Sequence, residues 1–235
     1  MKRLTVQSLI RISVLTVCIV LLSGCNKIIN WGRNNFKQAL KHSQDIVENV
    51  QPYFRSTIAY HKFTTIAEFD VLFLTDYVRM LFVDYHKKCC GMTAEQETLM
   101  RQRMLNENRY FISFYVAGTQ PENYYESNKS LFTGEYQKLN DILGEKDATW
   151  HMRLKIGAHE YLPDSIRRVD LPIEYRHFFA NRYSQFKTVY LVRFEAVTPS
   201  GRPILPLGQK NTLSLIFTSS TAQTCVEWKH VLYSK

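Results

Sequence analysis

Histidine and cysteine side chains stand close together at one point of the chain. His86 precedes Cys89 by three residues and Cys90 by four. Such spacings place side chains on one face of a helix, where imidazole and thiolate groups can bind zinc or copper. A complete site needs further ligands from elsewhere, and two adjacent cysteines cannot easily both reach one tetrahedral ion. The sequence therefore predicts no metal site and no cofactor.

The first 24 residues have the order of an export signal. Lys2, Arg3 and Arg11 form a basic segment, and the uncharged run Ile12–Leu22 follows. That run covers only about half of a bilayer core roughly 30 Å thick, so it is too short for a membrane-crossing helix. Directly after it, Leu22-Ser23-Gly24-Cys25 resembles the lipobox of bacterial prolipoproteins, in which a small residue precedes an obligatory cysteine.

This resemblance implies a diacylglyceryl thioether on Cys25, cleavage before that residue and acylation of the new amino terminus. Two or more acyl chains hold a protein stably on a membrane. Asn26 is not the aspartate that the resemblance associates with retention in the inner membrane. We therefore expect a protein of the bacterial cell envelope, anchored by lipid at the outer membrane and facing the periplasm. An ordinary secretory peptide or an uncleaved anchor helix is the alternative.

Export would place the remaining thiols in an oxidising compartment. We expect one disulfide that joins Cys225 to Cys89 or Cys90. On the chain-entropy model, a cross-link that closes so long a loop adds about 4–5 kcal/mol to the free energy of unfolding. The alternative is three reduced cysteines packed in the core, since cysteine is often buried.

No motif of a common enzyme class is present. The chain lacks G-x-x-x-x-G-K-[ST], G-x-G-x-x-G, H-E-x-x-H and G-x-S-x-G, which are typical of phosphate loops, dinucleotide folds, zinc peptidases and serine hydrolases. We therefore expect a non-enzymatic binding or assembly module. The alternatives are a periplasmic hydrolase whose site is assembled from scattered residues, and a carrier of a ligand or metal.

Positive charge is concentrated in the last third of the chain. Residues 150–235 hold 12 basic and 6 acidic residues, whereas residues 25–149 hold 15 of each. The basic region could face an anionic lipid or an acidic envelope protein, and each lysine or arginine near an anionic membrane contributes about 1 kcal/mol. Nucleic acid fits the charge but not the compartment, and a merely solvated face is the alternative. The residues expected to make this contact are Arg153, Lys155, Arg167, Arg168 and Arg193.

The elements that must position these residues follow two patterns. Ala67–Lys88 is the most apolar stretch after the signal, and the four charges that interrupt it favour a buried helix over a membrane span. Thr93 and Gln96 predict a capping box for a helix through about Asn108. Strands are expected where apolar or aromatic residues alternate or cluster, at 53–63, 109–117, 150–156, 187–197, 212–218 and 224–229.

Composition and pattern together indicate the fold class. With 235 residues, 45% of them hydrophobic, and five cysteines, the chain is too apolar for a disordered segment and too poor in cysteine for a disulfide-stapled miniprotein. We predict an α+β fold with N-terminal helices and an antiparallel C-terminal β-sheet or small sandwich. The expected divisions are a signal peptide (1–24), a tether and helix (25–52), a mainly helical region (53–148) and an antiparallel β region (150–235).

Overall fold

A computed structural model describes residues 47–120, 142–144, 148–205 and 211–231. These residues belong to the second of two compact units of the chain, Ile46–Lys235. In chain order its elements are η1 (Gln51–Tyr53), β1 (Phe54–His61), β2 (Thr64–Phe73), α2 (Asp76–Cys90), α3 (Ala94–Tyr110), β3 (Phe111–Thr119), β4 (His151–Ile156), β5 (His159–Tyr161), β6 (Ser165–Arg168), α5 (Ile173–Phe179), η2 (Ala180–Arg182), β7 (Thr188–Glu195), β8 (Asn211–Thr218) and β9 (Gln223–Val231).

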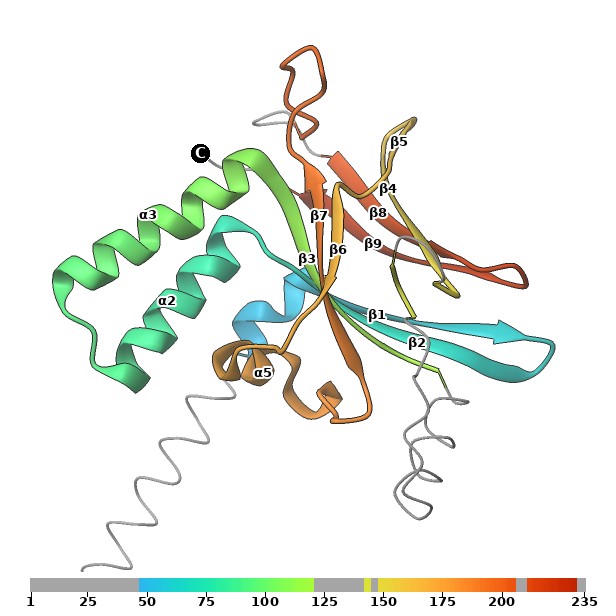
Figure 1. The fold of residues 1–235 in the computed structure, drawn as a ribbon, viewed down its shortest axis with the longest axis horizontal. Helices are drawn as coiled ribbons and strands as arrows, with labels where there is room; N and C mark the ends of the chain where they lie inside the picture. The colour runs from blue at the N-terminus through green and yellow to red at the C-terminus, as the bar shows by residue number, and fades with distance from the viewer. Residues whose placement is uncertain (1–46, 121–141, 145–147, 206–210, 232–235) are drawn as a thin grey trace, which may run out of the picture. The chain divides into compact units, whose positions relative to one another are not determined.

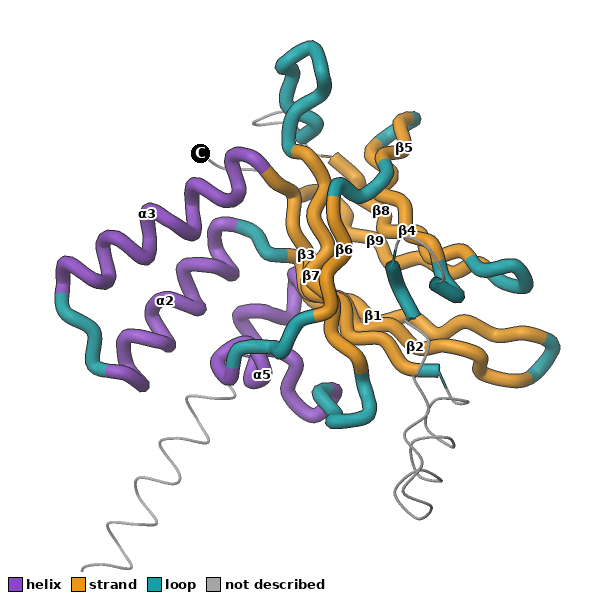
Figure 2. The backbone as a smooth tube through the Cα atoms, viewed as in Figure 1, coloured by secondary structure: helices purple, strands orange, loops and turns teal. Residues whose placement is uncertain are grey.

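The strands form two antiparallel sheets. One has the order β1-β2-β3-β7-β6 and the other the order β5-β4-β8-β9. Helices α2, α3 and α5 lie against one face of the five-stranded sheet, and the four-stranded sheet lies on the opposite side (Figure 1). The same three layers can be followed by element type in Figure 2. The α+β class with antiparallel strands, predicted from the sequence, is therefore confirmed.

The first hydrophobic core fills the space between the two sheets. Aromatic side chains dominate it: the rings of Phe69 and Phe217 stack with their centroids 4.2 Å apart, and Phe73 lies 4.9 Å from Phe114. Trp228 on β9 is buried here as well, and its indole N–H donates a hydrogen bond of 3.1 Å to the carbonyl of Tyr53. This core joins the two sheets into one packed unit.

A second core lies between the five-stranded sheet and the helices. Leu72 of β2 and Leu74, just after β2, pack here with Val78 and Phe82 of α2. Tyr175 of α5 joins the same cluster and stacks on Phe82 with a centroid distance of 4.4 Å. Both faces of the five-stranded sheet are thus covered, one by helices and one by strands.

The prediction of a single helix over Ala67–Lys88 is wrong in its first half. Residues 64–73 form β2, and a helix begins only at Asp76. The reason is that β2 is buried on both faces, so its apolar residues run continuously and lose the two-residue alternation of a half-buried strand. The described residues include no helix that is long and apolar enough to cross a membrane.

Specific capping residues bound the two long helices. The Thr75 side chain accepts a hydrogen bond from the backbone of Val78 at the start of α2. Gly91 ends that helix in the left-handed conformation, with φ of 67°, which glycine adopts without steric penalty. The predicted capping box of Thr93 and Gln96 at the start of α3 is confirmed.

The division expected between residues 53–148 and 150–235 is not a structural boundary within the described residues. Three strands, β1 to β3, share the first region with α2 and α3, and β3 pairs directly with β7 of the second region over eight residue pairs. The strands expected in the last third are confirmed as β4, β7, β8 and β9. The signal and most of the tether lie outside the described residues.

Candidate metal centre

One imidazole, one thiol and one carboxylate meet at the end of α2. His86 Nδ1 lies 2.6 Å from Glu174 Oε1 and 3.7 Å from Cys90 Sγ. The ligand atoms of all three residues lie within 4.8 Å of one another. His86 and Cys90 are one helical turn apart on α2, whereas Glu174 comes from α5. The structure thus brings a third group with a possible ligand atom from a distant segment, which the sequence could not identify.

Aromatic packing fixes the position of Glu174. Its neighbour Tyr175 is buried in the second core, and Phe178 lies one turn further along α5 in the same cluster. The His86 ring is itself stacked on Phe82, with a centroid distance of 5.8 Å and an interplanar angle of 16°. Because Phe82 contacts both Tyr175 and His86, one side chain of α2 aligns the imidazole with the carboxylate.

The three groups differ in their access to solvent. The side chain of Glu174 is only 8% exposed and that of His86 is 28% exposed, whereas Cys90 is exposed. An open groove of about 480 Å³ begins at His86 and Cys90 and continues between α2 and α3, where Met92, Met100 and Met104 line it. A small ion or ligand can therefore reach the cluster from this side.

The adjacent thiol has a different partner. The pKa of Tyr85 is raised to about 12. Burial of the phenol is the larger cause, and a hydrogen bond with Cys89 is the second. Cys89 is also absent from the group of His86, Cys90 and Glu174. This agrees with the sequence argument that two neighbouring cysteines do not both reach one ion, and it makes Cys89 a natural control for Cys90.

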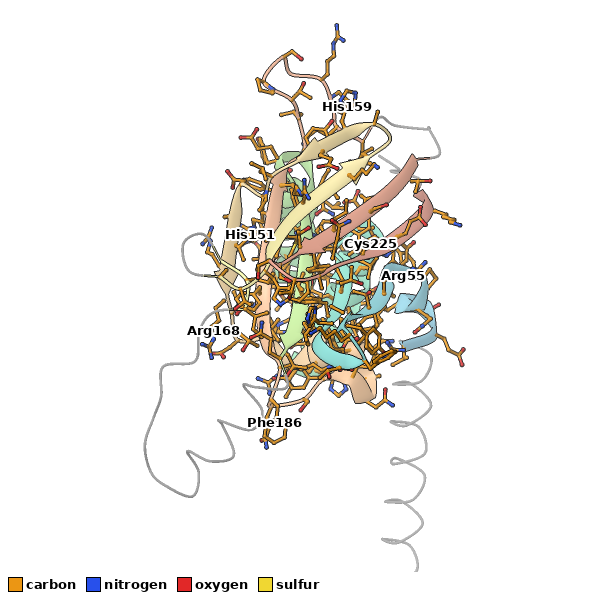
Figure 3. All side chains as sticks on the ribbon, turned by 90° about the vertical axis from the view of Figure 1, so that its right-hand side faces the viewer. Arg55, His151, His159, Arg168, Phe186 and Cys225 are labelled. Carbon is orange, nitrogen blue, oxygen red and sulfur yellow. The ribbon has the colours of Figure 1, made fainter. Side chains whose placement is uncertain are left out.

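The predicted disulfide is not present in the structure. Cys89, Cys90 and Cys225 are all free and exposed. On β9, Val226 and Trp228 point into the core between the sheets, so Cys225 faces outward. Figure 3 shows it on the outer face of the four-stranded sheet, near Arg55, whereas α2 lies on the far side of the five-stranded sheet (Figure 1). The alternative of cysteines packed in the core is also wrong for these three.

The structure does not gather the five basic residues onto one surface. Arg153 and Lys155 lie on β4, and Arg153 is paired with Glu160 at 3.0 Å. Arg167 and Arg168 are exposed on β6, the edge strand of the other sheet; Figure 3 labels Arg168.

Arg193 lies on β7, the strand that pairs with β6. Its guanidinium lies 3.7 Å from Glu107 of α3 and over the ring of Phe111, so it faces the helical layer. A single basic face composed of all five residues is therefore excluded.

Tyrosines beneath the cluster predict a loss of stability at alkaline pH. Burial raises the pKa of Tyr175 and of Tyr115 above the ordinary value of 10.0. Below pH 10 the phenols are protonated in both folded and unfolded chains. Above it the unfolded chain releases protons that the folded chain retains, so the free energy of unfolding falls as the pH rises. Urea unfolding on both sides of pH 10 measures this, and an identical alkaline loss in Tyr175→Phe and Tyr115→Phe would contradict the assignment.

Sequence reasoning considered His86 with Cys89 and Cys90 as metal ligands but predicted no metal site, and it did not identify Glu174. The segment Ile173–Phe179 gave no helical prediction, and no local spacing links residue 174 to residue 86. Cys25 lies outside the described residues. Comparison of the chain with models of known protein families gives no match, and comparison with curated proteins gives no significantly similar sequence.

Proposed function

We propose that the protein is a lipid-anchored protein of the bacterial cell envelope whose folded unit acts as a non-enzymatic binding module. The order of basic segment, short apolar run and Leu22-Ser23-Gly24-Cys25 supports lipid attachment to Cys25 and cleavage before it. Asn26 supports sorting to the outer membrane. Palmitate and other acyl chains at this end would hold the folded unit, which begins at Ile46, beside the bilayer.

The observation that carries the binding role is the open groove between α2 and α3. Its volume of about 480 Å³ lies in the range of small-molecule sites. Methionine side chains along it are flexible and polarisable, which suits a surface that adapts to what it binds. The thiol of Cys90 and the imidazole of His86 add two groups that can hold a ligand in one orientation.

The bilayer is the first partner in this proposal, through acylated Cys25. An anionic lipid or an acidic envelope protein is the second, approached by Lys155 and Arg167, which are exposed. Arg153 and Arg193 are less suitable because each already lies beside a glutamate. Nucleic acid is not proposed, because the compartment does not supply it.

Cys25→Ser is expected to abolish lipid attachment. In cells fed labelled palmitate, the wild-type chain carries label, whereas the variant carries none and accumulates as the uncleaved precursor, because serine cannot form the thioether. Electrophoresis of the immunoprecipitated protein measures both the label and the cleavage.

Cys18→Ser is the matched control, because Cys18 lies within the apolar run Ile12–Leu22 and outside the tetrapeptide. It should keep the label and normal cleavage. If Cys25→Ser still incorporates palmitate and fractionates with membranes as the wild-type does, the proposed anchor is wrong.

A further inference from the structure

We propose that His86, Cys90 and Glu174 bind a single Zn²⁺ ion, with a fourth position open to the groove between α2 and α3. This site needs only the folded unit and is independent of the lipid anchor, so either proposal can fail without the other. It also reverses the expectation from the sequence that no metal is bound.

The geometry of the thiol and the imidazole is close to that of a zinc site. In a tetrahedral site, the usual Zn–N and Zn–S bond lengths place the nitrogen and sulfur about 3.6 Å apart. His86 Nδ1 and Cys90 Sγ are 3.7 Å apart. Their spacing of one helical turn therefore holds both ligand atoms at the required separation without movement of the backbone.

The carboxylate completes the set after a small adjustment. Glu174 Oε1 lies 2.6 Å from His86 Nδ1, a hydrogen-bond distance, whereas ligands of one tetrahedral zinc lie about 3.4 Å apart. The ion would replace this hydrogen bond, and the two atoms would separate by less than about 1 Å. On binding, the Cys90 thiol gives its proton to solvent, and His86 binds through Nδ1 with its remaining proton on Nε2.

Burial gives Glu174 a reason to bind a cation. Its side chain is only 8% exposed, and a buried carboxylate is stable only beside a positive charge or hydrogen-bond donors. The hydrogen bond with His86 supplies one donor. A divalent ion at the same place would compensate the carboxylate more fully and would draw in the thiolate of Cys90.

The donor atoms select the ion. One sulfur, one nitrogen and one oxygen form a borderline set that suits Zn²⁺. Calcium and magnesium require shells of oxygen ligands, and Cu⁺ prefers sulfur over a carboxylate. The methionines that line the groove, Met100 and Met104 among them, make Cu⁺ the competitor that the experiment must distinguish.

Cobalt substitution tests the site directly. The full-length protein, purified in detergent, reduced with a phosphine and freed of metal by a chelator, is titrated with Co²⁺. We expect a thiolate-to-cobalt charge-transfer band and the intense visible bands of tetrahedral Co²⁺, both saturating at one ion per chain. Zn²⁺ should abolish both bands at the same stoichiometry.

Cys90→Ser and Cys89→Ser form a matched pair at neighbouring exposed thiols. Cys90→Ser should lose the charge-transfer band and weaken zinc binding more than about 100-fold, because losing a ligand costs more than losing a side chain that only hydrogen-bonds to a ligand. Cys89→Ser should keep the band and the wild-type affinity. Glu174→Gln, which preserves the shape of the side chain, should weaken binding at least about 10-fold, with circular dichroism checking that it folds.

Three results would overturn the proposal. One is an equal loss of cobalt binding in both cysteine variants. Another is unchanged zinc affinity in folded Glu174→Gln. The third is tighter binding of Ag⁺, used as a probe for Cu⁺, than of Zn²⁺, if that binding disappears in Met104→Leu. This result would mean that the groove holds soft ions through sulfur ligands and is not a zinc site.

Discussion

Asp70→Ala is expected to lower the free energy of unfolding by about 3–5 kcal/mol. Asp70 is fully buried in β2, where it accepts a hydrogen bond of 2.5 Å from Lys187 Nζ and another from the Ser56 hydroxyl. Removal of the carboxylate leaves Lys187, which is only 10% exposed, with Glu68 as its remaining acidic partner at 3.0 Å. A buried ammonium group that loses its closest counter-ion accounts for the predicted loss.

Urea unfolding followed by far-ultraviolet circular dichroism at neutral pH measures the effect. The matched control is Glu160→Ala, which removes an ion pair of 3.0 Å with Arg153 whose side chains are 39% and 42% exposed. Solvent screens that pair, so its loss should remain below about 1 kcal/mol.

A second variant separates the buried charge from the lost contacts. In Asp70→Leu combined with Lys187→Met, apolar side chains replace both buried ions. The charges left behind, Glu68 and Arg182, are 36% and 46% exposed and can be solvated, so most of the lost stability should return. If Asp70→Ala lowers the free energy of unfolding by less than about 1 kcal/mol, the buried pair contributes no more than a surface ion pair does, and the expectation is contradicted.

In the four-stranded sheet, the strands that the sequence identified correctly have one buried and one exposed face. On β4, Met152, Leu154 and Ile156 point into the core, and the polar residues between them face outward, so the alternation is visible in the sequence. The same pattern identified β9 through Val226 and Trp228. In these strands the alternation of apolar and polar residues shows which side chains are buried, because another layer covers only one face.

β2, in the middle layer, shows how the pattern can be lost. Phe69 and Phe73 face the four-stranded sheet, whereas Leu72 faces the helices. Both sets are buried, so the alternation disappears and a continuous apolar run remains. β2 also carries Glu68 and Asp70. Asp70 is paired with Lys187 and Arg182 from far along the chain, and nothing in the local sequence distinguishes it from a charge on a helix.

The candidate site was partly visible for the same reason. His86 and Cys90 are related by the helical repeat, which a sequence displays directly. Glu174 is separated from His86 by 88 residues, and tertiary packing, including that of Tyr175 on Phe82, places it there. When tertiary packing brings a residue to a site from a distant segment, no sequence spacing reveals that residue.

Phe69→Ala is expected to lower the free energy of unfolding by about 3–5 kcal/mol. The Phe69 ring is fully buried; it stacks on Phe217 of the other sheet at 4.2 Å and meets Trp150 edge-on at 5.3 Å. The backbone of Gly118 passes so close that a Cβ there would lie 3.3 Å from the ring. Neighbours this closely packed cannot fill the cavity left by the ring without separating other contacts.

Phe63→Ala provides the control, because Phe63 is fully exposed between β1 and β2 and its removal should change stability by no more than about 0.5 kcal/mol. Since Phe69 and Phe217 belong to different sheets, the variant also tests whether the sheets unfold together. If they do, tryptophan fluorescence and far-ultraviolet circular dichroism give one coincident transition, shifted to lower urea in Phe69→Ala. Two separated transitions, of which only one shifts in Phe69→Ala, would mean that each sheet is stable without the core between them. The predicted loss of stability would then apply to only one part of the fold.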